Sequence, residues 1–309
     1  MGPSDSDNAI RLKPPPTYST APPTLCTPWR TLPCIGEPGS QGKNAATTYP
    51  AATLAASAGV HAAAAAWAVS DPSRWPVALG AVALNHAAIA AACVAPRSGL
   101  LGPNLTRVGG ATGVVALTFD DGPDPEVTPQ VVALLASAGV TASFFCVGQR
   151  AVRHPEVVAA VRGNGHGIEN HTHHHHHGFA FSGPGALTAE IQRGQDAIAA
   201  VAGIAPRFFR APAGMRNPWV PGAVADVGLR YVSWTRRGFD AVSRDPARVA
   251  ARLTRGLTAG DILLLHDGNS ARLPGGRPVV LETLARVLDA MAAARLGSAP
   301  LHELVPPRA

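Results

Sequence analysis

An apolar run that ends in two adjacent carboxylates constrains the fold of this chain more than any other feature of its sequence. The run Gly113–Leu117 leads into Asp120 and Asp121, and a Gly-Pro turn follows them. Such a pattern predicts a buried strand with an active site at its carboxyl end. Because adjacent side chains at a strand end diverge, one carboxylate can bind a metal while its neighbour takes a proton from the water that the metal activates.

A histidine-rich segment further along the chain supplies the remaining ligands of such a site. His171 and His175 have the i, i+4 spacing that places two imidazoles on one face of a helix. One carboxylate and two imidazoles make an open zinc site. The uninterrupted run His173–His177 leaves His174 and His176 as alternatives for the second imidazole.

Apolar, strand-like runs alternate with helical stretches through the second half of the chain. The first four such segments are Val114–Phe119, Thr128–Ala138, Ala142–Val147 and Pro155–Gly163. This alternation predicts parallel strands joined by helices. Later strands are expected at Phe208–Phe209, Tyr231–Trp234 and Ile262–Leu265, each directly before a polar motif. The polar motifs are therefore predicted at the carboxyl end of one parallel α/β sheet.

Five motifs in this order resemble those of the polysaccharide deacetylase (NodB-homology) family of metal-dependent carbohydrate amidases. Besides the two described above, they are Phe209–Gly214 (FRAPAG), Ser233–Asp240 (SWTRRGFD) and Asp261–Asp267 (DILLLHD). Five ordered motifs are far more specific than any single pattern. The resemblance covers roughly residues 113 to 305. It implies a distorted, incomplete (β/α) barrel and a hydrolase that removes N-acetyl groups from the amino sugars of a polysaccharide or lipid-linked glycan.

The resemblance also implies which residues bind the metal and which one activates water. Asp121, His171 and His175 are the expected ligands of a divalent cation, and Asp120 is the expected general base. Zinc suits two imidazoles and a carboxylate with open positions, while cobalt, nickel or manganese could occupy the same site.

The other implied roles concern the leaving amine and the oxyanion. An amide needs an acid catalyst because an amine anion is a very poor leaving group. By resemblance, His266 is that acid, and Asp240 holds it and raises its pKa. Arg210 is expected to fix the base carboxylate, and the backbone N–H of Ala213 to bind the oxyanion together with the metal.

Two departures from the commoner family pattern bear on the substrate. Ala213 stands where an aromatic residue is frequent, and Ala241 stands where tryptophan is frequent. Both changes reshape the substrate groove and leave the chemistry intact, so the sugar specificity is not given by the resemblance. Met215, Trp219 and Phe239 are candidates for the groove lining, with burial in the core as the alternative.

Charge and cysteine content exclude two other classes of site. The formal net charge is +6, but the Arg residues are scattered and lack the interleaved aromatics of a single-strand binder, so a nucleic acid partner is not expected. Cys26, Cys34, Cys93 and Cys146 form no CxxC pair, which argues against a cysteine zinc site. We expect Cys146 to be a buried strand residue.

The chain divides into four parts by composition. Residues 1–50 are rich in Pro, Ser and Thr and are expected to be disordered. Residues 51–95 hold two uncharged apolar stretches, 51–69 and 75–95, that are each long enough to cross a bilayer as a helix. A linker at 96–112 and a catalytic domain at 113–309 follow.

A membrane hairpin is the preferred interpretation of residues 51–95. Trp67 and Trp75 flank its turn, where aromatic residues favour the interface. The alternative is a pair of alanine-rich helices packed on a soluble domain, which His61, Asn85 and His86 favour because polar groups are costly in lipid. The expected location is the inner or plasma membrane of a bacterium.

Two opposing arguments bear on the side of the membrane on which the catalytic domain lies, and they leave the topology open. Arg97 and Arg107 after the hairpin, with Arg30 and Lys43 before it, favour cytoplasmic ends by the positive-inside rule. The family resemblance implies action on cell-wall polymers outside that membrane. The first residues after Met1 are polar and acidic, so no signal peptide is expected there.

Two other functions use the same residues or the same fold. A related amidase or deformylase acting on a non-polymeric amide needs the identical catalytic set. A non-catalytic, membrane-anchored scaffold that binds glycans would keep the fold alone, although pseudoenzymes usually lose a ligand or the acid and none is missing here. The oligomeric state is not indicated by the sequence.

Overall fold

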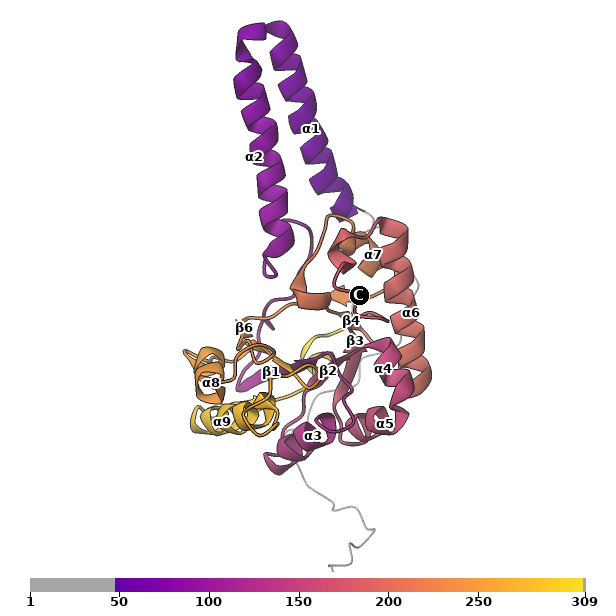
Figure 1. Ribbon diagram of the computed structural model, residues 1–309, viewed down its shortest axis with the longest axis vertical. Coiled ribbons are helices and arrows are strands. Elements are labelled where there is room, and N and C mark those ends of the chain that lie inside the picture. The colour runs from indigo at the N-terminus through magenta and orange to yellow at the C-terminus, as the bar shows by residue number, and fades with distance from the viewer. Residues whose placement is uncertain (1–47, 308–309) are drawn as a thin grey trace, which may run out of the picture. The chain divides into compact units, whose positions relative to one another are not determined.

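A curled parallel sheet forms the centre of the computed structural model, which describes residues 48–307 (Figure 1). Among these residues, eight strands pair in parallel in the order β5-β4-β3-β2-β1-β7-β6, and β8 pairs with β1. The strands are β1 (Val114–Asp120), β2 (Ser143–Cys146), β3 (Gly167–Asn170), β4 (Phe208–Phe209), β5 (Arg230–Tyr231), β6 (Arg236–Arg237), β7 (Ile262–His266) and β8 (Gly297–Ser298).

Helices connect successive strands and cover the outside of the curl. Figure 1 shows α9, α3 and α5 in a row along one side of the strands. The helices are α3 (Thr128–Ser137), α4 (Gly148–Arg153), α5 (Pro155–Gly163), α6 (Pro184–Ala202), α7 (Val220–Asp226), α8 (Pro246–Thr254), α9 (Val279–Ala293) and α10 (Leu301–Leu304). This is the incomplete (β/α) barrel that the family resemblance implies.

The central strand β1 is buried on both faces, as expected for a strand of a parallel sheet. On one face, Val115, Leu117 and Phe119 belong to a large core shared with α3, α8 and α9. On the other face, Ala116 packs in a smaller inner core with Phe145 and other residues. The two cores fix the strand between them and thereby hold its carboxyl end in place.

The expected elements are present, with two corrections. The strand predicted at Tyr231–Trp234 is β5, which begins one residue earlier, at Arg230, and ends at Tyr231 because its pairing with β4 extends over only two positions. The second correction concerns the histidine segment. Residues 171–176 are not helical; they form a loop after β3. Cys146 is a buried residue of β2, as predicted.

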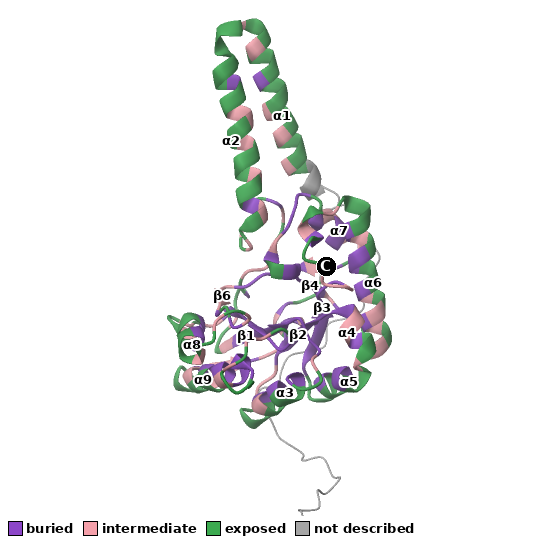
Figure 2. Ribbon diagram, viewed as in Figure 1, coloured by how far each residue is buried: buried purple, intermediate pink, exposed green. Residues whose placement is uncertain are grey.

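Two long apolar helices precede the sheet domain. Helix α1 (Thr48–Ser70) and helix α2 (Trp75–Val94) are joined by the 3₁₀ turn η1 (Pro72–Arg74). Both are long and apolar enough to cross a membrane, and only 6% and 11% of their most apolar windows are buried. Figure 2 shows exposed residues along both helices. The prediction of disorder for residues 1–50 and the prediction for Cys26 and Cys34 concern a part of the chain outside the described residues, except that α1 begins at Thr48.

Polar side chains join the two helices to each other. The Asn85 amide donates a hydrogen bond of 2.8 Å to the Ser57 hydroxyl. The His61 and His86 rings meet edge to face, with centroids 5.1 Å apart. These four residues give the hairpin its own internal polar contacts, which apolar helices in lipid use to associate.

The segment predicted as a linker, residues 96–112, makes specific contacts with the sheet domain. Leu101 is fully buried, and Leu105 forms a parallel bridge with Val232. The Val108 N–H donates to the Gly260 carbonyl at 2.8 Å. Residues that precede position 113 in the chain therefore belong to the packed domain.

Candidate active site at the strand ends

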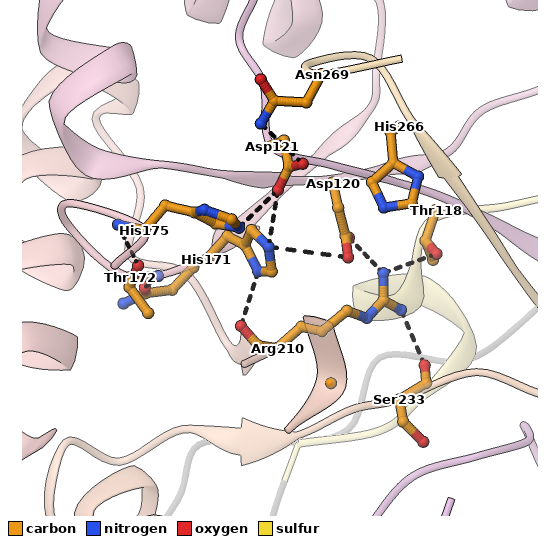
Figure 3. Close-up of polar contacts among 12 residues, drawn as sticks. Thr118, Asp120, Asp121, His171, Thr172, His175, Arg210, Ser233, His266 and Asn269 are labelled. Atoms are coloured by element: carbon orange, nitrogen blue, oxygen red, sulfur yellow. Dashed lines mark hydrogen bonds and ion pairs between the residues drawn. The ribbon is translucent and has the colours of Figure 1, made fainter. Parts of the chain in front are cut away.

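The carboxyl ends of β1 and β7 lie side by side and carry two of the expected catalytic residues. The parallel register pairs Asp120 of β1 with His266 of β7. Asp121 follows at the next position, outside the strand, with a left-handed φ of 72°. Asp120 pairs with Arg210 and Asp121 with His175. The His171 ring lies beside both carboxylates (Figure 3).

Asp121 and two histidines form a compact group of donor atoms. The Asp121 Oδ1 atom is 3.1 Å from His171 Nε2 and 2.9 Å from His175 Nε2. Burial acts to raise the pKa of Asp121, but hydrogen bonds from the two imidazoles outweigh it and hold that pKa far below its usual range. Asp121 and His171 are buried, whereas His175 is partly exposed and leaves the group open on its side.

The partners of these residues prepare them as metal ligands. His171 Nδ1 donates to the carbonyl oxygen of Arg210 at 2.8 Å, so that in the neutral ring a bound cation would meet the lone pair of Nε2. The Asn269 amide donates to Asp121 Oδ2 at 3.1 Å and fixes the other carboxylate oxygen. Two imidazole nitrogens and a carboxylate oxygen facing one another fit a divalent cation such as zinc.

The two imidazoles converge through a loop and not through a helix. Thr172 and His175 both have left-handed backbone conformations, with φ of 69° and 57°. The Thr172 hydroxyl accepts a hydrogen bond from the backbone N–H of His175 at 2.9 Å and so closes the turn. The i, i+4 spacing thus marked a pair that the structure brings together with Asp121, but the helical geometry assigned to it was wrong. His174 and His176, the alternatives, lie with Glu190 in a separate group of donor atoms.

Asp120 is held by a fully buried arginine. Arg210 NH1 is 2.5 Å from Asp120 Oδ1 and 3.0 Å from the Thr118 hydroxyl, and Arg210 NH2 donates to the Ser233 carbonyl at 2.9 Å. The guanidinium also lies 4.0 Å from the centroid of the Phe145 ring. Such a charge-assisted contact fixes one carboxylate oxygen. The second oxygen of Asp120 lies 4.0 Å from His171 Nε2, beside the donor group.

His266 is paired with a buried aspartate. Asp240 Oδ1 is 2.8 Å from His266 Nδ1, and Asp240 Oδ2 accepts the backbone N–H of His266 at 2.7 Å. Burial alone would lower the pKa of His266, but the Asp240 charge and hydrogen bond outweigh it and raise that pKa to about 9. The ring is therefore an imidazolium at neutral pH, with its Nε2 proton free of Asp240.

The third motif follows Arg210 in the 3₁₀ turn η3 (Pro212–Gly214). Ala213 is exposed there, with a φ of 54°. Among the candidate groove residues, Trp219 and Phe239 are 41% and 43% exposed, and Met215 is partly buried. The two large rings are thus not core residues, which leaves them accessible to a ligand.

Comparisons with known proteins identify the family of this chain. The family model of polysaccharide deacetylases matches residues 108–232. A peptidoglycan-N-acetylglucosamine deacetylase of Bacillus cereus is 35% identical over 161 residues, which are 52% of this chain and 75% of that protein. A chitooligosaccharide deacetylase of Azorhizobium caulinodans is 31% identical over 60% of this chain and 92% of its own length. This chain belongs to the polysaccharide deacetylase family.

A solved structure extends the agreement to the fold. A family 4 carbohydrate esterase from Streptomyces lividans, determined in complex with acetate, superposes with a TM-score of 0.55 at 30% identity. The alignment covers 61% of the present deacetylase and 93% of the other chain. The protein is thus a hydrolase of the polysaccharide deacetylase type.

Several residues of the deacetylase site had not been identified from the sequence. Besides Asn269, Arg150 donates to the Asp121 carbonyl at 2.8 Å and to the Asn269 side chain at 3.0 Å. Asp267 is buried, accepts the Thr128 hydroxyl at 2.6 Å, and has its pKa raised to about 7 chiefly by burial. Asn269 follows the fifth motif by two residues, which was the only available signal for it. Arg150 lies outside all five motifs in the sequence, so no signal pointed to it.

Proposed function

We propose that this protein hydrolyses the N-acetyl group of N-acetylglucosamine units in a cell-wall glycan, with Asp120 as base and His266 as acid. The observation that carries the proposal is the placement of these two side chains on paired positions of β1 and β7, beside the Asp121, His171 and His175 donors. Amide hydrolysis requires a base, an acid and a group that polarises the carbonyl, and these residues could supply all three.

Asp120 accepts the proton of the attacking water. Arg210 holds Oδ1, so the proton goes to Oδ2, the oxygen nearer to the donor group. A divalent cation bound by Asp121, His171 and His175 would acidify that water and polarise the acetyl carbonyl. Arg210 also keeps Asp120 in one orientation, which removes the entropic cost of positioning the base.

His266 delivers a proton to the departing amine. Its pKa of about 9 keeps the ring protonated at neutral pH, and Asp240 fixes the Nδ1 side so that Nε2 is the donating atom. The pair thus supplies the acid that an amine leaving group needs. The backbone N–H of Ala213, in the turn directly after Arg210, is the proposed partner of the oxyanion.

The substrate class follows from the relatives and from the exposed rings. The similar proteins are named for peptidoglycan and for chitooligosaccharides, both of which contain N-acetylglucosamine. Phe239 is held by two arginines, Arg237 at 4.9 Å and Arg252 at 5.5 Å from its ring centroid. Phe239 precedes Asp240, the partner of His266, and its exposed ring offers a flat apolar face on which a sugar ring can pack.

We further propose that the hairpin α1–α2 anchors the enzyme to a membrane. Its surface is almost entirely apolar and exposed, and its polar side chains pair with each other, as in Asn85 with Ser57. An exposed apolar surface of this length requires a covering phase, which a bilayer provides.

The first test is acetate release from N-acetylglucosamine oligomers and from peptidoglycan by the full chain in detergent. We expect release that depends on added zinc and stops with a chelator. Asp121→Asn should abolish release at any zinc concentration, because one of three ligands loses its charge.

A zinc-loaded, folded protein that releases no acetate from either glycan would contradict the proposal. Formate release from N-formyl amines by the same sample would then favour the deformylase alternative. Binding of the oligomers without any release, measured by titration calorimetry, would favour the scaffold.

A further inference from the structure

A second group of metal-type donors lies in the same histidine run as the first. His174, His176 and Glu190 place their donor atoms within 4.8 Å of one another. The His174 Nδ1 atom is 2.9 Å from Glu190 Oε2, and the His174 and His176 rings lie nearly parallel with centroids 5.0 Å apart. None of the three takes part in the proposed reaction, because the donors facing Asp121 are His171 and His175.

Glu190 is held as an ionised ligand before any metal arrives. It lies on α6 and is only 6% exposed. Its Oε1 atom accepts the backbone N–H groups of His173 and His174 at 3.1 and 2.6 Å, which leaves Oε2 for the imidazoles. Burial acts to raise the pKa of Glu190, but the hydrogen bonds from His174 outweigh it and lower that pKa.

The geometry is close to that of a bound cation. In the tetrahedral geometry that zinc prefers, ligand atoms about 2.0–2.2 Å from the ion lie about 3.4 Å apart. The group therefore closes by a shift of at most about 1.5 Å, and the His176 side chain, which is exposed, can make it. Arg193 NH2, at 3.2 Å from Glu190 Oε2, is the competing cation, but its side chain is 59% exposed and can leave.

We propose that His174, His176 and Glu190 form a second, independent site for a divalent transition metal such as zinc or nickel. Two imidazoles and a carboxylate are the donor set that these ions prefer. The site joins the loop to helix α6 on both sides of His175, one of the donors facing Asp121. A metal there links the loop to α6 without contacting the substrate.

Metal stoichiometry of the full-length protein in detergent tests the proposal. After equilibration with micromolar free zinc and gel filtration, elemental analysis should give two zinc ions per chain. The variant His176→Ala should give one. The matched control is His177→Ala, which removes the neighbouring exposed imidazole from outside the group and should keep two.

A second measurement locates the loss. Asp121→Asn should also reduce the content to one zinc ion, and its combination with His176→Ala should leave none. Arg193→Ala should tighten the His174–His176–Glu190 site several-fold, since it removes the competing charge. One zinc ion in the unaltered protein, two in His176→Ala, or the same loss in His177→Ala as in His176→Ala would each overturn the proposal, whatever the enzymatic activity.

Discussion

The strand ends and the hairpin hold their polar residues in opposite ways. At the strand ends, each charged side chain meets partners from other elements, as Arg210 joins β1, the Ser233 carbonyl and the ring of Phe145. In the hairpin, the contacts of Ser57, His61, Asn85 and His86 stay within α1 and α2.

The two regions differ in what fixes the positions of their polar side chains. A catalytic residue is fixed by the fold around it, so its geometry survives changes elsewhere but not the loss of a direct partner. The hairpin has a few polar side-chain contacts between its own helices, and two hydrogen bonds join it to later residues, from Thr53 to the Leu100 carbonyl and from the Arg216 N–H to the Cys93 carbonyl. The following substitutions test how far this difference extends.

Asp120→Asn should have the largest effect, because it removes the base. We expect kcat to fall by about 10³-fold, with zinc content and circular dichroism unchanged. Asp196→Asn is the matched control, since Asp196 is exposed on α6 and pairs only with Gln192 of the same helix. Comparable acetate release by the Asp120→Asn and Asp196→Asn variants would remove Asp120 from the mechanism.

Asp240→Asn should have the next largest effect, through the pKa of His266. In the unaltered enzyme the required imidazolium is lost as pH rises through about 9, so activity falls there. Without the Asp240 charge this alkaline limb should move toward pH 6.5, with roughly 10–100-fold less activity at neutral pH. A pH profile of kcat/KM checks this, and an unmoved alkaline limb would contradict the assigned acid.

The interaction of His266 with Asp240 should also make the stability of the folded protein depend on pH. Because the folded-state pKa of His266 is raised from 6.5 to about 9, its contribution is fully present below pH 6.5 and is lost as pH rises through 9. Thermal unfolding between pH 6 and 10 should show a decline in that window. Asp240→Asn should flatten the decline, whereas an equal slope in both proteins would indicate another group.

Removal of residues 1–95 should change catalysis least among the effects at the site. The hairpin and the strand ends share none of the catalytic contacts, so kcat on soluble oligomers should stay within about twofold. Flotation with lipid vesicles should be lost at the same time. A large fall in kcat in the folded, zinc-loaded fragment would show that the hairpin supports the site.

Asn85→Ala should have the smallest effect. Hydrogen bonds between membrane helices contribute about 0.6 to 2 kcal/mol, so we expect a loss of that size in the unfolding free energy in detergent. Leu84→Ala is the control, because Leu84 occupies the adjacent position and is 73% exposed. Equal effects of the two substitutions would argue against the Ser57 contact.

The fold was largely predictable because several of its strands are marked both by an apolar run and by a polar motif directly after it. Val114–Asp120 and Ile262–His266 are short apolar runs that end at polar motifs, and the structure places strands at both. The order of helices and strands followed from the same alternation. What failed was the helix at the histidines, since left-handed conformations at Thr172 and His175 are not encoded in their spacing.

The site was predictable only where its residues belong to motifs. Asp120, Asp121, His171, His175, Arg210, Asp240 and His266 were expected, and the structure brings them together. Arg150 and Glu190 were missed because their contacts, with Asp121 and with His174, join residues 29 and 16 positions apart that only the packing of α4 and α6 brings together. Such long-range contacts leave no local pattern.

The pairing of Asp120 with His266 across β1 and β7 has a consequence for how this enzyme type diversifies. The backbones that carry the proposed base and the proposed acid are one strand spacing of about 4.8 Å apart, maintained by the hydrogen bonds of the sheet. The turn at Ala213 and the segment at Phe239 lie outside both strands. Under the proposed roles, these segments could be exchanged for others that select a different sugar without moving the two paired backbone positions.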